Sequence, residues 1–157
     1  MQSSKVYEDN KFLAFMNIQL VNKWHVLIIP KKHYELVSDM DKKSLGEIRI
    51  IVERINSAIR KSKIKCQGIN FFLADEEAAG QEVFHVHLHV IPRFKNDDFG
   101  FKFPKNYKNK PEIKEIEEAA RKIKVFIWLL TDFLKLNNIY FTNMDIEEFW
   151  ILTNYST

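Results

Sequence analysis

Apolar runs of strand length recur through the first part of the chain. Residues 6–16 are predicted to form a hairpin, in which two apolar segments are joined by the polar turn Glu8-Asp9-Asn10. His25–Ile29 is an almost continuous apolar run closed by Pro30, which is typical of a buried strand. Gly68–Leu73 is predicted to be another strand.

Two other segments carry apolar residues at helical spacing. Ser44–Lys63 is predicted to be a long helix covering one sheet face, with an apolar stripe of Leu45, Ile48, Ile51, Val52, Ile55 and Ile59. Ser44 and Glu47, three residues apart, predict a capping box at its start. A second helix is predicted from Pro111 to a basic end at Lys124, with a stripe of Ile113, Ile116, Ala120 and Ile123.

The pattern becomes strict alternation in Gln81–Arg93. Three histidines, His85, His87 and His89, alternate there with Val86, Leu88 and Val90, between Gly80 and Pro92. A period of two predicts a strand on which the three imidazoles share one face, roughly 6–7 Å apart. The valines and the leucine are expected to face the core.

Three histidines on one strand face allow three interpretations. A neutral imidazole is a good nucleophile near pH 7, because its ordinary pKa is about 6.5 and neighbouring imidazoles discourage one another from carrying charge. The other imidazoles can then donate hydrogen bonds or protons to a phosphate and to a leaving group. Alternate histidines can instead chelate zinc, or they can be solvated side chains on a sheet face. The spacing alone leaves all three open.

Composition narrows the class of protein. The chain has 157 residues, 46% hydrophobic and 29% charged, which predicts an ordinary globular domain. The net charge of +3 is too small to indicate a nucleic-acid partner. Cys66 is the single cysteine, so no disulfide framework is possible within one chain, and no signal peptide is visible at the N-terminus. A cytoplasmic location is therefore expected.

Three motifs resemble the histidine triad (HIT) family of nucleotide hydrolases and transferases. Residues 78–93 match the family pattern His-φ-His-φ-His-φ-φ after a Gly-Gln, where φ is apolar. Residues 25–33 read His-Val-Leu-Ile-Ile-Pro-Lys-Lys-His and match a second family motif, and residues 7–15 are similar to the family's N-terminal hairpin. The resemblance implies an α+β fold, in which an antiparallel sheet is accompanied by one long central helix and a C-terminal helix. It also implies a homodimer in which the sheets of the two subunits are joined.

The resemblance also implies roles for individual residues. The expected catalytic residues are His87, His85, His89 and His25. Of these, His87 is expected to attack the α-phosphate, while His85 and His89 position phosphate oxygens. His89 is also expected to protonate the leaving group. His25 corresponds to the fourth histidine of the family, which lies beside the triad. The expected nucleotide-binding residues are Asn17 at the ribose hydroxyls, Ile18, Gly80, and Gln81 at a phosphate oxygen. The family needs no catalytic metal, and no cofactor is expected.

The implied activity is hydrolysis at the α-phosphate through a nucleotidyl-histidine intermediate, which releases a nucleoside monophosphate such as AMP. Dinucleoside polyphosphates are the expected substrates, because Ile91-Pro92-Arg93-Phe94 is more similar to that branch than to the Gly-rich exit of the phosphoramidase branch. A nucleoside phosphoramidase and a nucleotide-binding protein without turnover are the alternatives.

Three features depart from the family pattern. Lys23-Trp24 stand where a Pro-Gly is common, and Ala74, followed by three acidic residues, stands where many members carry an asparagine that contacts the nucleotide. Residues 1–124 are expected to form the HIT domain, and residues 125–157 an extension packed on that domain or on the dimer interface. The apolar run 125–130 is too short for a membrane span, which needs about 20 residues.

Overall fold

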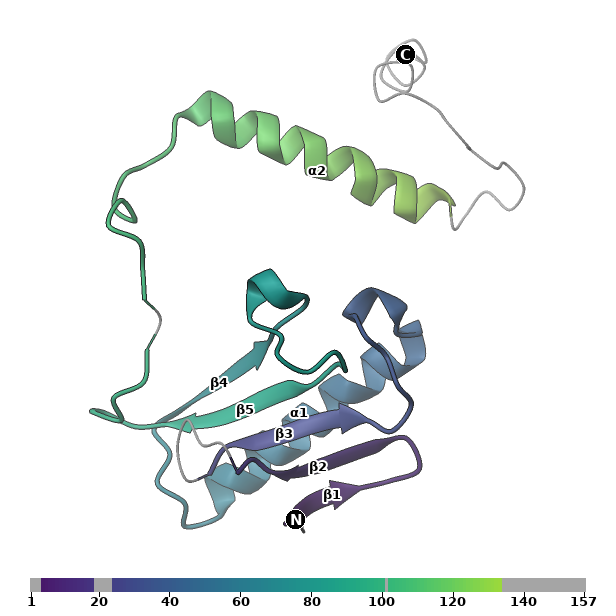
Figure 1. Cartoon of the computed structure of the whole chain (residues 1–157), viewed down its shortest axis with the longest axis vertical. Helices are drawn as coiled ribbons and strands as arrows, with labels where there is room; N and C mark the ends of the chain where they lie inside the picture. Colours follow the sequence, from purple (N-terminus) through teal and green to yellow (C-terminus); the bar gives the residue numbers. More distant parts are fainter. Residues whose placement is uncertain (1–3, 19–23, 101, 134–157) are drawn as a thin grey trace. The chain divides into compact units, whose positions relative to one another are not determined.

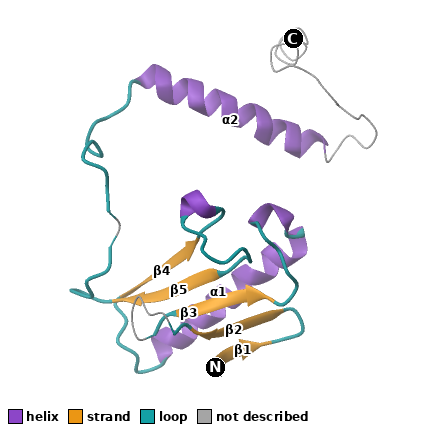
Figure 2. Ribbon diagram, in the orientation of Figure 1, coloured by secondary structure: helices purple, strands orange, loops and turns teal. Residues whose placement is uncertain are grey.

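The computed structural model describes residues 4–18, 24–100 and 102–133. The chain divides into two compact units, Met1–Phe101 and Lys102–Thr157. The described part of the first unit contains a sheet and one long helix, and that of the second contains the helix α2, Ile113–Phe133 (Figure 1 and Figure 2).

Within the described residues, five strands form one antiparallel sheet (Figure 1). In chain order they are β1 (Lys5–Glu8), β2 (Phe12–Met16), β3 (Val26–Pro30), β4 (Gly68–Leu73) and β5 (Leu88–Arg93). Their order across the sheet is β1-β2-β3-β5-β4, so β5 lies between β3 and β4, which come from earlier in the chain. The predicted α+β class and N-terminal hairpin are confirmed.

The core of the first unit lies between the sheet and the long helix α1 (Lys42–Lys61), which runs along one sheet face (Figure 1). The buried isoleucines of α1 follow the predicted stripe: Ile48, Ile51, Ile55 and Ile59. The sheet contributes Phe12, Ala14, Val26, Ile28 and Val90 to the same cluster. Because neighbours on a strand alternate between faces, Val90 in this core places His89 on the face opposite α1.

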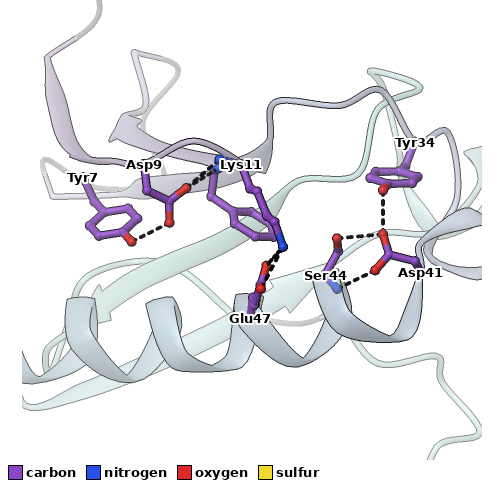
Figure 3. A network of polar contacts seen from close by, with 8 residues as sticks. Tyr7, Asp9, Lys11, Tyr34, Asp41, Ser44 and Glu47 are labelled. Atoms are coloured by element: carbon purple, nitrogen blue, oxygen red, sulfur yellow. Dashed lines mark hydrogen bonds and ion pairs between the residues drawn. The ribbon is translucent and has the colours of Figure 1, made fainter.

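The predicted capping box at Ser44 and Glu47 is wrong, because α1 begins two residues earlier and is capped by Asp41 (Figure 3). The Asp41 carboxylate accepts hydrogen bonds from the Ser44 backbone N–H at 2.9 Å, the Ser44 hydroxyl at 2.8 Å and the Tyr34 hydroxyl at 2.9 Å. These bonds, led by the Ser44 backbone N–H, hold the pKa of Asp41 well below its usual range. Glu47 instead pairs with the Lys11 ammonium at 2.8 Å.

The predicted histidine strand is only partly regular. β5 begins at Leu88, so His89 lies in the strand while His85 and His87 precede it. The ladder stops there because the preceding segment bonds to a loop: the Val86 N–H donates to the Tyr34 carbonyl at 2.7 Å. Burial alternates only in part: Val86 is 1% exposed and Val90 is fully buried, whereas Leu88 is half-buried like the three histidines. β5 also continues through Pro92 to Arg93, beyond the predicted boundary.

The helix of the second unit is longer than predicted. α2 begins at Ile113 rather than Pro111 and continues through the predicted end at Lys124 to Phe133. Residues 125–133 contain no glycine or proline, the two residues that most strongly disfavour a helix, so the helix is not interrupted after the basic residues. The rest of the predicted extension, residues 134–157, lies outside the described residues. None of the described helices is long and apolar enough to cross a membrane.

Candidate active site

His87 is held in one tautomer by the backbone just before it. Its Nδ1 lies 2.7 Å from the carbonyl oxygen of His85. A carbonyl can only accept, so Nδ1 carries the proton and donates it. In the neutral ring the lone pair is then on Nε2, at the other end of the imidazole. His87 therefore presents a nucleophilic nitrogen whose orientation is fixed by its own backbone.

His89 lies beside His87, with ring centroids 4.9 Å apart and an edge-on arrangement. His89 is joined in turn to His25, which precedes β3: His25 Nε2 and His89 Nδ1 are 2.8 Å apart. The register of β3 and β5 explains this contact, because Leu27 pairs with His89 and Val26 pairs with Val90. The sheet thus brings together two histidines 64 positions apart in sequence.

A chain of hydrogen bonds fixes the tautomers of both rings. The Asn17 amide Nδ2, which can only donate, lies 3.2 Å from His25 Nδ1. His25 therefore accepts at Nδ1 and donates from Nε2–H to His89 Nδ1. His89 is left with its proton on Nε2, where it can donate a hydrogen bond, and its ring lies beside that of His87.

Burial keeps this relay uncharged. Burial lowers the pKa of His25 to about 4, and positive charge on His87 contributes in the same direction. The pKa of His89 is likewise lowered to about 4. Burial is the main cause, and positive charge on His25 or His87 lowers this pKa in the same direction. Both rings are neutral at pH 7, as the hydrogen-bond chain from Asn17 requires.

His85 takes a different place from the other two triad members. Its Nε2 donates to the Pro30 carbonyl at 2.9 Å, and its ring stacks on His33, with centroids 5.1 Å and planes 11° apart. The two Nδ1 atoms are 3.1 Å apart, so His33 Nδ1–H donates to His85 Nδ1 when both rings are neutral. His33 was not among the predicted site residues, although it stands at the end of the second family motif.

The loop between β4 and the triad is closed by Gln81, which is 2% exposed. Its amide donates to the Glu35 carbonyl at 2.8 Å, and its side-chain oxygen accepts from the Glu76 N–H at 2.7 Å. Gly80 adopts a φ of +91°, which glycine takes without strain. The expected phosphate contact of Gln81 stays a prediction; in this structure its amide fixes the loop.

Glu76, in the same loop, is strained. Its φ of 74° and ψ of 163° fall in a region used almost only by glycine, at a cost of about 1–3 kcal/mol. Ala74, at the position where the family commonly has asparagine, is 2% exposed and offers no polar side chain. This loop is therefore one place where the chain departs from the family pattern.

The other predicted nucleotide-binding residues lie next to the relay. Ile18 is 64% exposed and follows Asn17, whose amide is bonded to His25. Trp24 packs edge-on against Phe94, with centroids 6.1 Å apart. Across residues 4–18, 24–100 and 102–133, no group of three histidine, cysteine or acidic side chains is placed to hold a metal ion.

A family model, the HIT domain, matches residues 1–96 of this sequence. The chain belongs to the HIT family. A HIT-like protein from Borreliella burgdorferi is 41% identical over 128 residues, which are 81% of this chain and 91% of that protein. A crystal structure of a HIT family protein from Bacillus anthracis is similar with a TM-score of 0.69 and 36% identity, covering 79% of this chain and 87% of that one.

One relative in the HIT family has a named activity. A bis(5'-adenosyl)-triphosphatase from Dictyostelium discoideum is 34% identical over 96 residues, which are 61% of this chain and 64% of that protein. The matched region of 96 residues is shorter than the match to the Borreliella protein, at 128 residues.

Because the fold of this HIT protein holds His25 in its neutral form, we expect the protein to lose stability in mild acid. Its pKa is about 4 when folded and about 6.5 when unfolded, so below pH 6.5 only the unfolded chain takes up the proton. The contribution of His25 is therefore fully present above pH 6.5 and is lost as the pH falls towards 4. From pH 7 to pH 5 we expect the unfolding free energy to fall by about 2 kcal/mol through this one group.

Urea denaturation of wild type and His25→Asn at pH 7 and pH 5 measures this contribution. Asparagine does not titrate, so the variant should lose less stability between the two pH values. Titrating groups that do not contact His25 cancel in the comparison, whereas the pKa of His89, which is bonded to His25, changes with the substitution. Equal losses in both proteins would show that His25 is not held neutral by the fold.

Proposed function

We propose that this HIT protein hydrolyses nucleotides at the α-phosphate through a nucleotidyl-histidine intermediate on His87. The observation that carries the proposal is the 2.7 Å bond from His87 Nδ1 to the His85 carbonyl, which leaves the Nε2 lone pair free for attack. Covalent catalysis divides one difficult displacement into two easier ones.

In the first step, the Nε2 lone pair of His87 forms a bond to the α-phosphorus, and the bond from phosphorus to the leaving group breaks. The Nε2–H of His89 donates a hydrogen bond to the charge that develops on the phosphoryl oxygens or the leaving group. In the second step, water attacks the same phosphorus and breaks the phosphorus–nitrogen bond. The products are the nucleoside monophosphate and His87 in its starting form, with one proton released to solvent.

Dinucleoside polyphosphates are the proposed substrates. A nucleotide leaves as a stable anion, for which a hydrogen bond from neutral His89 is sufficient, whereas an amine leaves only after protonation. The pKa of His89, about 4, makes its protonated form scarce at pH 7. The activity named for the Dictyostelium relative supports the same substrate class. A phosphoramidase is the alternative activity within the same site, and Asn17, Ile18, Gly80 and Gln81 are the proposed nucleotide contacts.

We propose further that the protein acts as a cytoplasmic homodimer joined at the β4 edge of the sheet. β4 is an edge strand, and its large apolar side chains Phe71 and Phe72 are 47% and 37% exposed. An exposed apolar edge strand favours pairing with another chain. Phe72 also lies beside His89, with centroids 5.7 Å apart, so this edge adjoins the site. The unpaired Cys66 is consistent with a reducing compartment.

Incubation with diadenosine triphosphate in ¹⁸O-water and chelator tests the reaction. We expect AMP and ADP as products, with the ¹⁸O in AMP, because water attacks the α-phosphorus. An adenosine phosphoramidate in a parallel reaction should be cleaved more slowly. Label in ADP would show that water attacks a phosphorus other than the α-phosphorus. A faster reaction with the phosphoramidate would indicate a phosphoramidase. Binding of AMP without turnover of either compound would indicate a nucleotide-binding protein without catalytic activity.

A further inference from the structure

The helix α2 carries a second pattern that the proposed catalysis does not use. Its apolar positions Ile113, Ile116, Ala120, Ile123 and Ile127 are spaced alternately by three and four residues. This is the a/d spacing of a heptad repeat, which forms a narrow seam for one partner helix. In the structure Ile113, Ile116 and Ile123 are 73%, 52% and 61% exposed.

The charges beside the seam are arranged for a particular partner. Glu117 and Lys124 occupy successive e positions, seven residues apart on one edge of the seam. Within the described ranges neither forms an ion pair, whereas Glu118 on the outer face pairs with Lys122 at 2.8 Å. A helix that offers a lysine opposite Glu117 and a glutamate opposite Lys124 is complementary to this edge.

We propose that this partner is α2 of a second copy of the chain, packed antiparallel. When Ala120 is placed opposite Ile123 of the second copy, Ile116 lies opposite Ile127 of that copy. Each described a position of one helix then faces a d position of the other helix, and each d position faces an a position. The same register brings Glu117 against Lys124 of the second copy, and Lys124 against its Glu117, so both e positions find the opposite charge. On the other edge the small g residue Ala119 meets the large g residue Phe126.

A parallel pair lacks this complementarity. In a parallel heptad pair, each g residue lies near the e residue five positions further along the partner. Glu112, in the g position just before α2, would then face Glu117 of the second copy, and these like charges repel. Lys124 would face the methyl group of Ala119. Electrostatics and side-chain size therefore both select the antiparallel arrangement.

The proposal concerns α2 alone and is separate from the chemistry at His87 and from pairing at the β4 edge. A seam of about two heptads is short for an isolated coiled coil. Two copies already joined elsewhere would present their helices at high effective concentration, so both contacts would strengthen the same dimer. Failure of the helix pairing leaves the hydrolase proposal unchanged.

Cross-linking of the full chain with a short bismaleimide tests the arrangement. In a Cys66→Ala background, Ala120→Cys is expected to cross-link efficiently, because the two copies of residue 120 lie about 4–5 Å apart along an antiparallel seam. Ile113→Cys is expected not to cross-link, because its two copies lie roughly 25 Å apart at the same rise per residue. A parallel pair would cross-link through both cysteines.

Charge reversal tests the register in the Ala120→Cys protein. Glu117→Lys creates two lysine–lysine contacts and is expected to weaken helix pairing about tenfold, read from the cross-linking rate. Adding Lys124→Glu restores both pairs with the signs exchanged, and the rate should recover. Glu118→Lys, which makes the same charge change on the outer face, is the matched control and should leave the rate near that of the unreversed protein.

Two results would overturn the proposal. Cross-linking through Ile113→Cys as efficiently as through Ala120→Cys would show a parallel pair. Cross-linking through neither cysteine, or a rate that does not respond to reversal of Glu117, would show that this face of α2 contacts something other than the α2 of a second copy.

Discussion

Replacing His87 with alanine is expected to lower kcat by on the order of 10⁴-fold or more, with little change in KM. The substitution removes the proposed nucleophile, and neither half-buried neighbour can replace it. His89 Nδ1 is bonded to His25 and its Nε2 carries a proton, while both nitrogens of His85 are engaged by Pro30 and His33. Steady-state hydrolysis of diadenosine triphosphate measures the loss.

The His87 intermediate should also be trapped directly. A brief reaction of wild type with a substrate labelled at the α-phosphate, quenched in alkali, should leave label on the protein, because a phosphorus–nitrogen bond survives base and is cleaved by acid. His87→Ala should retain none. Glu53→Ala, on the exposed side of α1, is the matched control and should keep both label and turnover. A His87→Ala protein that retained a tenth of wild-type kcat would exclude His87 as the nucleophile.

Replacing Phe12 with alanine is expected to reduce the unfolding free energy by about 3–5 kcal/mol. Phe12 is 1% exposed and belongs to the cluster between the sheet and α1, so its removal leaves a cavity. The backbone there is held independently of the ring, because the Phe12 N–H donates to the Asp9 carboxylate at 2.7 Å. The loss should therefore report packing, and urea denaturation measures it.

Phe71→Ala is the matched control for the core substitution. Phe71 lies in the same sheet but is 47% exposed in the single chain, so at protein concentrations too low for the proposed dimer the same truncation should cost about 1 kcal/mol. Similar losses for the two variants would mean that the core does not lie between β2 and α1. A loss at Phe71 that depends on protein concentration would instead support burial of the β4 edge in a dimer.

The sequence predicted those features that depend on local periodicity. Four apolar isoleucines at helical spacing specified the buried face of α1, and alternation at Val86 and Val90 specified which side of the histidine segment faces the core. The family motifs identified the histidines themselves. These predictions were accurate because burial of a repeating apolar face is the dominant favourable term in folding, and its period is visible in the chain.

Choices between equivalent local signals were less predictable. Both Ser44 and Asp41 are good N-cap residues, and Glu47, three residues after Ser44, favoured Ser44 in the local pattern. In the fold Glu47 pairs with Lys11 from the N-terminal hairpin, and Tyr34 supports Asp41. The competing partners are distant in sequence, so the local pattern could not rank them.

By itself the sequence determined that three alternating histidines would face away from a sheet core and that a long helix would cover one sheet face, while its resemblance to the HIT family implied that the sheet is antiparallel. Only the tertiary structure decided what each imidazole does. The strand register joins His25 to His89, the Pro30 carbonyl and His33 take both nitrogens of His85, and the His85 carbonyl orients His87. Tautomer and charge depend on these partners, and most of them come from distant segments that meet only in the folded sheet.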